Sequence, residues 1–390
     1  MRAFLRIAYL IINHNKREGT SKAIAEVAER MAQRHEVHVF SRTAEGVNLS
    51  GMQWHRVPGP SYPHVAEFLG YVLPCAVRVR RSRFDIIHAA GSVSTAADIY
   101  TIQNIQPAKR TVLRSLEKHE HAGLARRITR LAYLRVTSAW ERWAYERSKP
   151  RRPMFLPVST GVARELKAFY RVGDAPCRII PNAADILRFK PVTDRETIRR
   201  RMGLCSEDFV CAFSGGEWRR KGLDLAIQAL ALVADPRVKL LVLGRDDAAP
   251  EFETLARQCG AAKQVVFAGF QKNVEEPLAC ADLFLFPSRY EAFSLATLEA
   301  AACGLPILAP RINGAEDFIQ PGVNGEFIEH AASHIASVLQ SLASDVSRCR
   351  TMGKAGRRLV EEQYTWDRVA AMTEQAYHEV LERKGACAAA

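Results

Sequence analysis

The chain has 390 residues, which are too many for one compact core, so we expect two domains. Apolar residues make up 48% of it and charged residues 25%, as in soluble globular proteins, and no apolar run reaches the roughly 18 residues of a membrane-spanning helix. The net charge is +13, and nine cysteines without a C-x-x-C pair predict reduced thiols in a cytoplasmic protein, not a disulfide framework or a zinc site.

The first part of the chain alternates between short apolar runs and helical patterns. The apolar stretch at the start of the chain could be mistaken for a signal peptide, but Arg6 interrupts it and Asn13-His14-Asn15-Lys16 stands where a signal peptide would have small residues. Residues 6–12 therefore predict a buried strand. A helix with an apolar side follows at 21–33. Short apolar strands between helices predict a parallel sheet with both faces covered. The further strands predicted here are 37–40, 84–88, 100–102 and 155–158.

A strongly basic segment precedes the last of these strands. Residues 105–152 hold 13 Lys or Arg and 4 Asp or Glu, a local charge of +9. Apolar residues recur there at helical spacing, and Trp140 and Trp143 follow them. A basic amphipathic helix with Trp at its rim binds anionic membrane surfaces, at about 1 kcal/mol for each well-placed cation. A helix that faces the core and exposes a basic side is an equal alternative, and no nucleic-acid recognition motif accompanies the charge.

The alternating pattern restarts after Pro181, which places the predicted domains at 1–180 and 181–365. We therefore expect an α/β protein with two Rossmann-like, doubly wound parallel sheets that face a central cleft. Such units bind ligands outside the carboxyl ends of their strands. The strands predicted in the second domain are 209–213, 239–243, 265–267, 283–286 and 306–308.

The loop after the first strand of the second domain favours phosphate. Gly215 and Gly216 allow close backbone approach, and Arg219, Arg220 and Lys221 place three consecutive cations where a diphosphate would arrive. The G-x-x-x-x-G-K-[ST] spacing of a Walker A loop is absent. A solvated basic turn is the alternative for this loop taken alone.

A loop-to-helix junction after strand 283–286 carries two carboxylates eight residues apart, Glu291 and Glu299. Ser294 is a suitable N-cap for a helix over 295–302, and Gly304 is a suitable end for it. Unpaired first-turn N–H groups and the helix dipole make such a junction an anion site. A site that binds phosphate and fixes hydroxyls on either side suits a nucleotide-sugar. An ordinary surface helix with two incidental glutamates is the alternative.

The segment 287–300 resembles the E-x7-E motif of the family 4 retaining glycosyltransferases, which have the two-domain GT-B fold. The resemblance implies that Glu291 contacts the donor sugar and that Glu299 contacts the ribose hydroxyls. The loop 213–224 resembles the R-K-G-x-D loop of the family, which implies that Arg220 and Lys221 neutralise the leaving diphosphate. On the same basis the donor-binding residues include Phe293, Ser294, Leu295, Ala296 and Gly19.

The resemblance is weaker in the first domain. The last helix, 366–385, is expected to cross back and pack on that domain. His88 ends a predicted strand, and Gln103 and Asn104 stand where many members have His or an acidic residue, so these three are the acceptor-side candidates. Neither amide can act as a base near neutral pH, and His88 also fits a purely structural role.

These features predict a retaining, metal-independent hexosyltransferase that uses a nucleotide-diphosphate sugar and a glycan or lipid-linked acceptor. The loop 219–222 and the turn at 290–292 are most like those of members that build lipopolysaccharide core, which implies a bacterial cell-envelope role in the cytoplasm or on the inner face of the membrane. We expect no further cofactor and no nucleic acid. Two alternatives stay open. One is a sugar-nucleotide 2-epimerase of the same architecture, and the other is a non-catalytic basic protein that binds membrane or nucleic acid.

Overall fold

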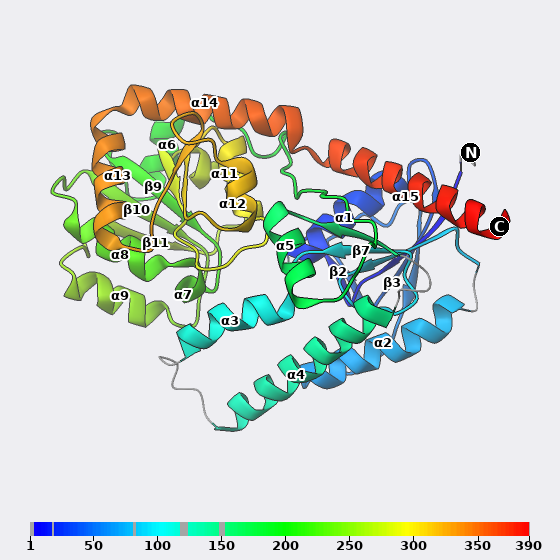
Figure 1. Ribbon diagram of the computed structural model, residues 1–390. Coiled ribbons are helices and arrows are strands. Elements are labelled where there is room, and N and C mark those ends of the chain that lie inside the picture. Colours follow the sequence, from blue (N-terminus) through cyan, green and yellow to red (C-terminus); the bar gives the residue numbers. More distant parts are fainter. Residues whose placement is uncertain (1–3, 18, 81–82, 118–123, 148–152, 390) are drawn as a thin grey trace. The chain divides into compact units, whose positions relative to one another are not determined.

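The computed structural model describes residues 4–17, 19–80, 83–117, 124–147 and 153–389 (Figure 1). The chain divides into two compact units. The first unit comprises residues 1–182 together with 366–390, and the second unit comprises residues 183–365. Within the described ranges no helix is long and apolar enough to cross a membrane, and the cysteines there are free thiols.

The first unit is built on a six-stranded parallel sheet with the order β5-β3-β1-β6-β7-β8. The chain winds outward in both directions from the central pair, as in a doubly wound sheet. The central strands are buried, because helices cover both faces. The strands are β1 (Arg6–Leu10), β3 (Glu36–Ser41), β5 (Met52–Arg56), β6 (Ile86–Ala90), β7 (Ile99–Ile102) and β8 (Met154–Pro157), and β2 (Asn13–Asn15) pairs separately with β4 (Thr43–Glu45).

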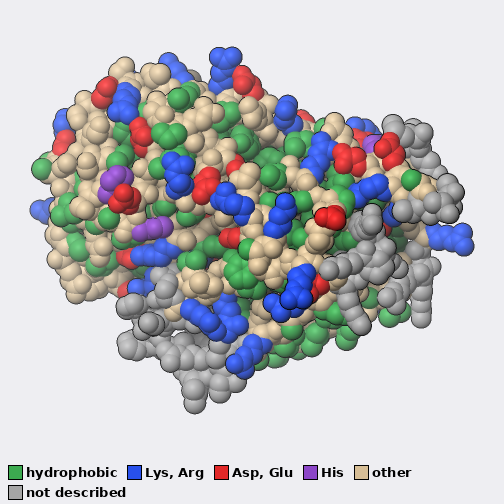
Figure 2. Space-filling view, in the orientation of Figure 1, with side chains coloured by type: hydrophobic (Ala, Val, Ile, Leu, Met, Phe, Trp, Pro, Cys, Tyr) green, Lys and Arg blue, Asp and Glu red, His purple; other side chains and the backbone are tan. Residues whose placement is uncertain are grey.

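Five helices of the described chain follow these strands, and a sixth comes from the chain end. Of these, α2 and α4 pack side by side. On α2, Leu73 and Val77 are exposed, and Figure 2 shows a band of apolar side chains where Figure 1 places these two helices. The helices are α1 (Gly19–Met31), α2 (His64–Arg80), α3 (Gln106–Glu117), α4 (Leu124–Arg147) and α5 (Thr160–Phe169).

The basic segment 105–152 divides between core and surface. Trp140 packs edge-on against Phe68 and donates its indole N–H to the Ser92 carbonyl at 2.6 Å. Trp143, one turn further, is 39% exposed. The stretches 118–123 and 148–152, and the side chains of Leu124, Ile128 and Leu131, lie outside the described residues. Trp140 therefore supports a helix that faces the core, and Trp143 supports a helix that exposes a Trp at its rim.

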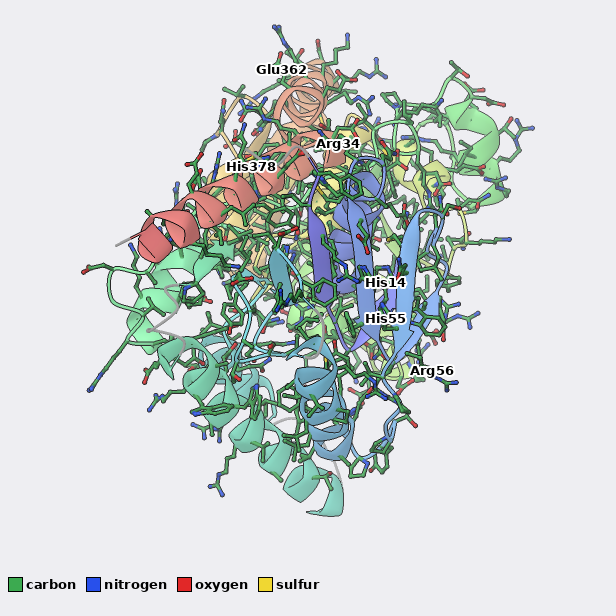
Figure 3. The ribbon with its side chains drawn as sticks, turned by 90° about the vertical axis from the view of Figure 1, so that its right-hand side faces the viewer. His14, Arg34, His55, Arg56, Glu362 and His378 are labelled. Carbon is green, nitrogen blue, oxygen red and sulfur yellow. The ribbon has the colours of Figure 1, made fainter. Side chains whose placement is uncertain are left out.

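The last helix, α15 (Trp366–Ala389), belongs to the first unit and packs against α1. The Tyr377 hydroxyl lies 2.6 Å from the Tyr9 hydroxyl of β1, and both side chains are buried. At the surface, Arg34 in the turn after α1 pairs with Glu374 at 2.9 Å, and Figure 3 shows Arg34 beside α15. Buried hydrogen bonds and a charged rim thus attach α15 to the unit that contains the start of the chain.

The second unit repeats the plan with the strand order β11-β10-β9-β12-β13-β14, again parallel throughout. Its strands are β9 (Phe209–Ser214), β10 (Val238–Leu243), β11 (Val265–Gly269), β12 (Leu283–Leu285), β13 (Ile307–Ala309) and β14 (Gly325–Phe327). Its helices are α6 (Arg195–Arg201), α7 (Trp218–Lys221), α8 (Leu223–Leu232), α9 (Ala249–Gln258), α10 (Glu275–Ala279), α11 (Leu295–Ala302), α12 (Asn313–Phe318), α13 (Ala332–Ser344) and α14 (Val346–Gln363).

The parallel α/β class predicted for both halves of the chain is confirmed. Two strands at the edges of the sheets, β5 and β14, are not predicted from the sequence. Strand β5 has the sequence MQWHR and lies largely exposed, so it carries no apolar signal. Strand β14 begins at Gly325, where a Cβ would come 2.2 Å from the Ile307 carbonyl oxygen, so glycine lets this edge approach its neighbour.

Candidate active site

The carboxyl ends of neighbouring strands in the second unit bring the two sequence motifs together. Strand β9 ends at Ser214 and leads through the glycine turn to α7, whereas β12 leads through 286–294 to α11. The two strands are adjacent in the sheet. Their loops touch, because the Arg289 N–H donates to the Arg220 carbonyl at 2.9 Å. The basic loop and the glutamate loop therefore lie at one edge of the sheet.

Two glycines make this close approach possible. A Cβ at Gly215 (φ +121°) would lie 2.0 Å from the Lys221 ammonium nitrogen. A Cβ at Gly222 (φ +78°) would lie 2.1 Å from the Pro287 carbonyl oxygen. Both positions need glycine for space and for the left-handed backbone. The loop thus seats a lysine ammonium directly against the main chain.

Lys221 is partly buried, and the charges of Glu291, Glu217 and Glu299 act on its ammonium. Its ammonium donates to the Ser214 carbonyl at 3.3 Å and lies 5.2 Å from the centre of the Phe286 ring. Burial lowers the pKa of Lys221, although the charge of Glu291 opposes this shift. A lysine held by one long hydrogen bond among the described residues keeps N–H donors for an incoming anion.

Arg220 connects the two loops directly. Its guanidinium lies 2.7 Å from one carboxylate oxygen of Glu291 and 2.8 Å from Glu217, and it also contacts the Tyr290 carbonyl. Ser288 donates its hydroxyl to the same Glu291 oxygen at 3.1 Å. Burial by itself would lower the pKa of Arg220, but the two carboxylates outweigh it and raise the pKa. Arg220 and Ser288 thereby hold Glu291 through one of its carboxylate oxygens.

The first turn of α11 begins as the sequence predicts. Ser294 is the N-cap (φ −68°, ψ 120°), and its hydroxyl accepts a hydrogen bond from the Thr297 N–H at 3.3 Å. The N–H groups of Leu295 and Ala296 belong to this first turn and have no partner inside the helix. Gly304 (φ +82°) follows the helix end. Glu291, Phe293 and Ser294 line one small hollow beside this turn.

Glu299 lies one turn further along α11 and shares its surroundings with a residue that sequence reasoning missed, Arg188. The Arg188 guanidinium binds Glu275 at 2.9 Å, and this bond raises the pKa of Arg188 together with the charge of Glu299. The charge of Glu299 also reaches Lys221. Arg188 lies near the start of the second unit, and no motif described above contains it.

The first-unit candidates are more dispersed. Gly19 is exposed at the start of α1. His88 is buried, with its ring nitrogens 2.8 Å from the Tyr377 hydroxyl and 2.7 Å from the Thr101 hydroxyl. Gln103 forms a buried amide pair with Asn182, and Asn104 accepts a hydrogen bond from the Gln106 side chain. His88 thus has a structural environment, and an acceptor role for these residues stays a prediction.

A cavity of about 240 Å³ opens at the carboxyl ends of β1 and β6, next to the start of α1. None of His88, Gln103 and Asn104 lines it. The residues that line this cavity have both polar and apolar side chains, as sugar-binding surfaces do. They are Ile11, Ile12, Asn13, Thr20, Ser21, His64, Glu67, Phe68, Ala90, Val93 and Tyr133.

Two family models match the chain one after the other. The model described as Glycosyltransferase Family 4 matches residues 17–188, and the model described as Glycosyl transferases group 1 matches residues 194–359. The chain belongs to this glycosyltransferase family. The second model covers every residue of the two loops around Lys221 and Glu291.

Relatives of this glycosyltransferase support the same conclusion. The D-inositol 3-phosphate glycosyltransferase of Xylanimonas cellulosilytica is 30% identical over 236 residues, which are 57% of this chain and 56% of that one. The chain thus spans about half the length of the curated relatives that it matches.

Solved structures show the fold of this glycosyltransferase over nearly its full length. WaaG, a glycosyltransferase involved in lipopolysaccharide biosynthesis, has a TM-score of 0.78 at 22% identity and covers 96% of this chain and 99% of its own. Anabaena HepE, solved with UDP and glucose, has a TM-score of 0.74 at 18% identity, and the match covers 96% of this chain and 100% of HepE. The predicted GT-B fold is confirmed.

Proposed function

We propose that this protein transfers a hexose from a nucleotide-diphosphate sugar to a glycan or lipid-linked acceptor, with retention of the anomeric configuration. One observation carries the proposal. Lys221, the Arg220–Glu291 pair and the first turn of α11 gather at the carboxyl edge of one parallel sheet. Two cations and free helix amides suit a diphosphate, and carboxylates beside them suit hydroxyl groups.

The chemistry follows from the charge that develops during transfer. Breaking the glycosidic phosphate bond builds negative charge on the diphosphate and positive charge on the sugar carbon. Lys221, Arg220 and the α11 amides stabilise the diphosphate, which can supply several kcal/mol of the barrier. Glu291, held by Arg220 and Ser288, binds the sugar hydroxyls and favours the cationic carbon. Glu299 binds the ribose. The leaving phosphate accepts the acceptor's proton, and no metal ion takes part in this proposal.

Relatives and neighbours agree with these ligands. HepE was solved with UDP and glucose, and the Xylanimonas relative is a D-inositol 3-phosphate glycosyltransferase. WaaG, which acts in lipopolysaccharide biosynthesis, favours an envelope glycan as the product. The cavity of the first unit that Asn13, Glu67 and Tyr133 line is the acceptor pocket in this proposal.

The first experiment measures donor binding. A panel of UDP- and GDP-sugars is tested for protection against thermal unfolding, because a ligand present at about 100 times its Kd adds about 2.7 kcal/mol of stability. We expect one sugar of one nucleotide to protect best, with and without EDTA. Protection by none of them, with binding of RNA or vesicles that disappears at moderate salt, would favour the non-catalytic alternative.

The second experiment measures transfer. Glu291→Ala and Lys221→Ala are compared with Glu253→Ala and Lys263→Ala, two exposed residues of the same unit. We expect the first pair to lose transfer and the second pair to keep it. Near-normal rates in the first pair would refute the roles proposed here. Conversion of the donor without any acceptor would identify a 2-epimerase instead.

An anionic membrane surface is the partner that we propose for the α2 and α4 side of the first unit. Leu73 and Val77 are exposed on α2, Trp143 is exposed on α4, and Arg135 and Arg142 lie exposed on the same helix as Trp143. Apolar side chains flanked by cations suit a peripheral site on anionic lipid. We expect sedimentation with phosphatidylglycerol vesicles that Trp143→Ala and Leu73→Ala weaken. Equal sedimentation of both variants and the parent would argue against this face.

A further inference from the structure

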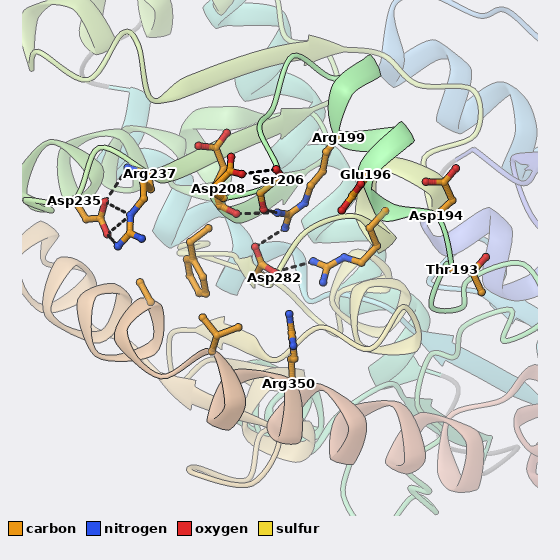
Figure 4. Close-up of a pocket in the computed structure, with 15 residues that line it drawn as sticks. Thr193, Asp194, Glu196, Arg199, Ser206, Asp208, Asp235, Arg237, Asp282 and Arg350 are labelled. Carbon is orange, nitrogen blue, oxygen red and sulfur yellow. Dashed lines mark hydrogen bonds and ion pairs between the residues drawn. The ribbon is translucent and has the colours of Figure 1, made fainter.

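A large groove lies at the opposite edge of the second-unit sheet, at the amino ends of the strands. A cavity of about 750 Å³ adjoins Phe209, which begins β9, and Asp282, which precedes β12 (Figure 4). A second cavity of about 340 Å³ shares Arg195, Asp282 and Arg350 with it. The two cavities are therefore the outer and inner lobes of one groove between α14 and the segment that leads into α6. The groove has no part in the chemistry proposed above.

The inner lobe combines an apolar floor with a basic rim. Its floor is formed by small and aliphatic residues, and its rim by one side of α14. Arg350 and Lys354 stand there one turn apart, both exposed, and neither has a hydrogen-bond or ion-pair partner within the described chain. Unpaired cations above an apolar floor match a ligand with an acidic group and an apolar body. The floor residues are Ala279, Ala281, Cys303, Leu305 and Cys349.

The junction between the lobes is positively charged. Asp282 accepts from Arg195 at 2.7 Å and from Arg199 at 2.6 Å, so one carboxylate serves two guanidinium groups. Its second oxygen also accepts from the Val210 N–H at 2.7 Å, which leaves the carboxylate fully used. The Nε atom of Arg195 is buried without a hydrogen-bond partner. Figure 4 shows Arg350 pointing from α14 toward this cluster, where it adds a further positive charge.

The inner lobe also touches the helix of the candidate active site from its far end. Cys303, Gly304 and Leu305, which line the lobe, form the turn after α11. Arg357 of α14 ties this turn to the rest of the unit, since its guanidinium donates to the Ala302 and Phe189 carbonyls at 2.6 Å each. A ligand between α14 and this turn therefore contacts the element that carries Glu299 one turn before the contact and Ser294 at its other end.

We propose that this groove is a second ligand site of the protein, which binds a small amphiphilic anion. The acidic headgroup lies between Arg350, Lys354 and Arg195, and the apolar part lies on the floor of the inner lobe. The outer lobe contains more carboxylates than cations, but its described carboxylates at Asp235 and Asp282 are already paired with arginines. At the junction itself, the charged residues that line both lobes are Arg195, Arg350 and the single carboxylate Asp282, so an anion is favoured over a cation there.

The probe for this site is octyl phosphate, whose chain and headgroup match the inner lobe in size and charge. Calorimetric titration of the full-length protein is expected to give saturable binding below about 1 mM, with inorganic phosphate and octyltrimethylammonium at least about tenfold weaker. Arg350→Glu with Lys354→Glu is expected to weaken octyl phosphate at least about tenfold. The matched charge reversal Lys263→Glu, on an exposed residue outside the groove, is expected to leave it unchanged.

Other outcomes overturn the proposal. Equal binding by the double variant would place the probe elsewhere, and loss of binding in Lys221→Met would place it in the donor site. Tighter binding of octyltrimethylammonium would assign the groove to a cation. Binding to phosphatidylglycerol vesicles that depends on Arg350 and Lys354, without binding of octyl phosphate, would assign it to a lipid surface. Because the readout is binding and not transfer, this test stands apart from the test of the proposed activity.

Discussion

Replacement of Lys221 by Met separates the effect of this lysine on folding stability from its effect on transfer activity. In the folded protein the ammonium has one hydrogen bond of 3.3 Å among the described residues, to the Ser214 carbonyl, which is worth about 1 kcal/mol. Against this stands the cost of burying the charge, which lowers the pKa of Lys221. Exchange of a buried charge for an apolar side chain of similar volume is often neutral or stabilising. We therefore expect the unfolding free energy of Lys221→Met to fall by less than about 1 kcal/mol.

Transfer activity is expected to respond very differently. Loss of one preorganised charge that stabilises the leaving diphosphate costs about 2.7–4 kcal/mol, or about 100- to 1,000-fold in kcat. Urea unfolding and a donor-turnover assay on the same preparation give both numbers. Lys239→Met is the matched control, because Lys239 also donates to one carbonyl, at 3.2 Å, but stands in β10 away from the site. A Lys221→Met enzyme with more than about a tenth of parental activity would refute the reasoning.

The pH dependence of stability gives an independent check on Lys221. Below its lowered pKa the amine is protonated in both states, and the folded state bears the cost of desolvation. As the pH rises through that value the folded state loses its proton first, so stability increases until the unfolded lysine titrates near about 10.4. Lys221→Met is expected to lose this increase, whereas Lys239→Met is expected to keep it.

Three further predictions concern other residues. His14 is buried without a hydrogen-bond partner among the described residues, and burial lowers its pKa from 6.5 to about 4, so folding stability is lost as the pH falls between these values. His14→Phe is expected to reduce the stability lost between pH 7 and pH 4 by about 3 kcal/mol, as measured by urea titrations. An unchanged loss would contradict this. Arg357→Ala removes hydrogen bonds to three backbone carbonyls and an ion pair with Glu361, and it is expected to cost about 3 kcal/mol of unfolding free energy and to raise the KM for donor. Its neighbour Arg358, which among the described residues pairs with Glu362, is expected to tolerate Ala. Equal effects of the two substitutions would be inconsistent with a positioning role for Arg357. Gly314→Ala places a Cβ 2.3 Å from the Phe293 ring, so we expect the unfolding free energy to fall by about 1–3 kcal/mol and the KM for donor to rise. A variant with unchanged stability and KM would show that Phe293 can move freely.

The second-unit site is the part of the molecule that the sequence predicts best. Ser294 as the cap, 295–302 as the helix and Gly304 after its end are local features, because capping and left-handed glycine depend on the residues themselves. The pairing of Arg220 with Glu291 is not local, but it follows once both loops are placed at the carboxyl ends of adjacent parallel strands.

Other features depend on contacts that no local pattern encodes. The environment of His88 is set by Tyr377, 289 residues away, so its buried hydrogen bonds are invisible to strand and motif reasoning. The charge of Glu299 reaches Arg188 although the two residues lie far apart in the sequence, and no local pattern relates them. The first-unit cavity brings together residues of different strands, turns and helices, and only Thr20 and Ser21 among them adjoin a residue that the family resemblance singles out, Gly19.

The attachment of α15 to the first unit has a consequence for biosynthesis. The hydroxyls of Tyr9 and Tyr377 meet although 368 positions separate them, so the first unit receives its last helix only after the whole second unit has been synthesised. The inserted middle domain, whose residues are contiguous, can mature earlier. A nascent chain stopped before position 366 would therefore present the face of the first unit that α15 covers to chaperones and proteases.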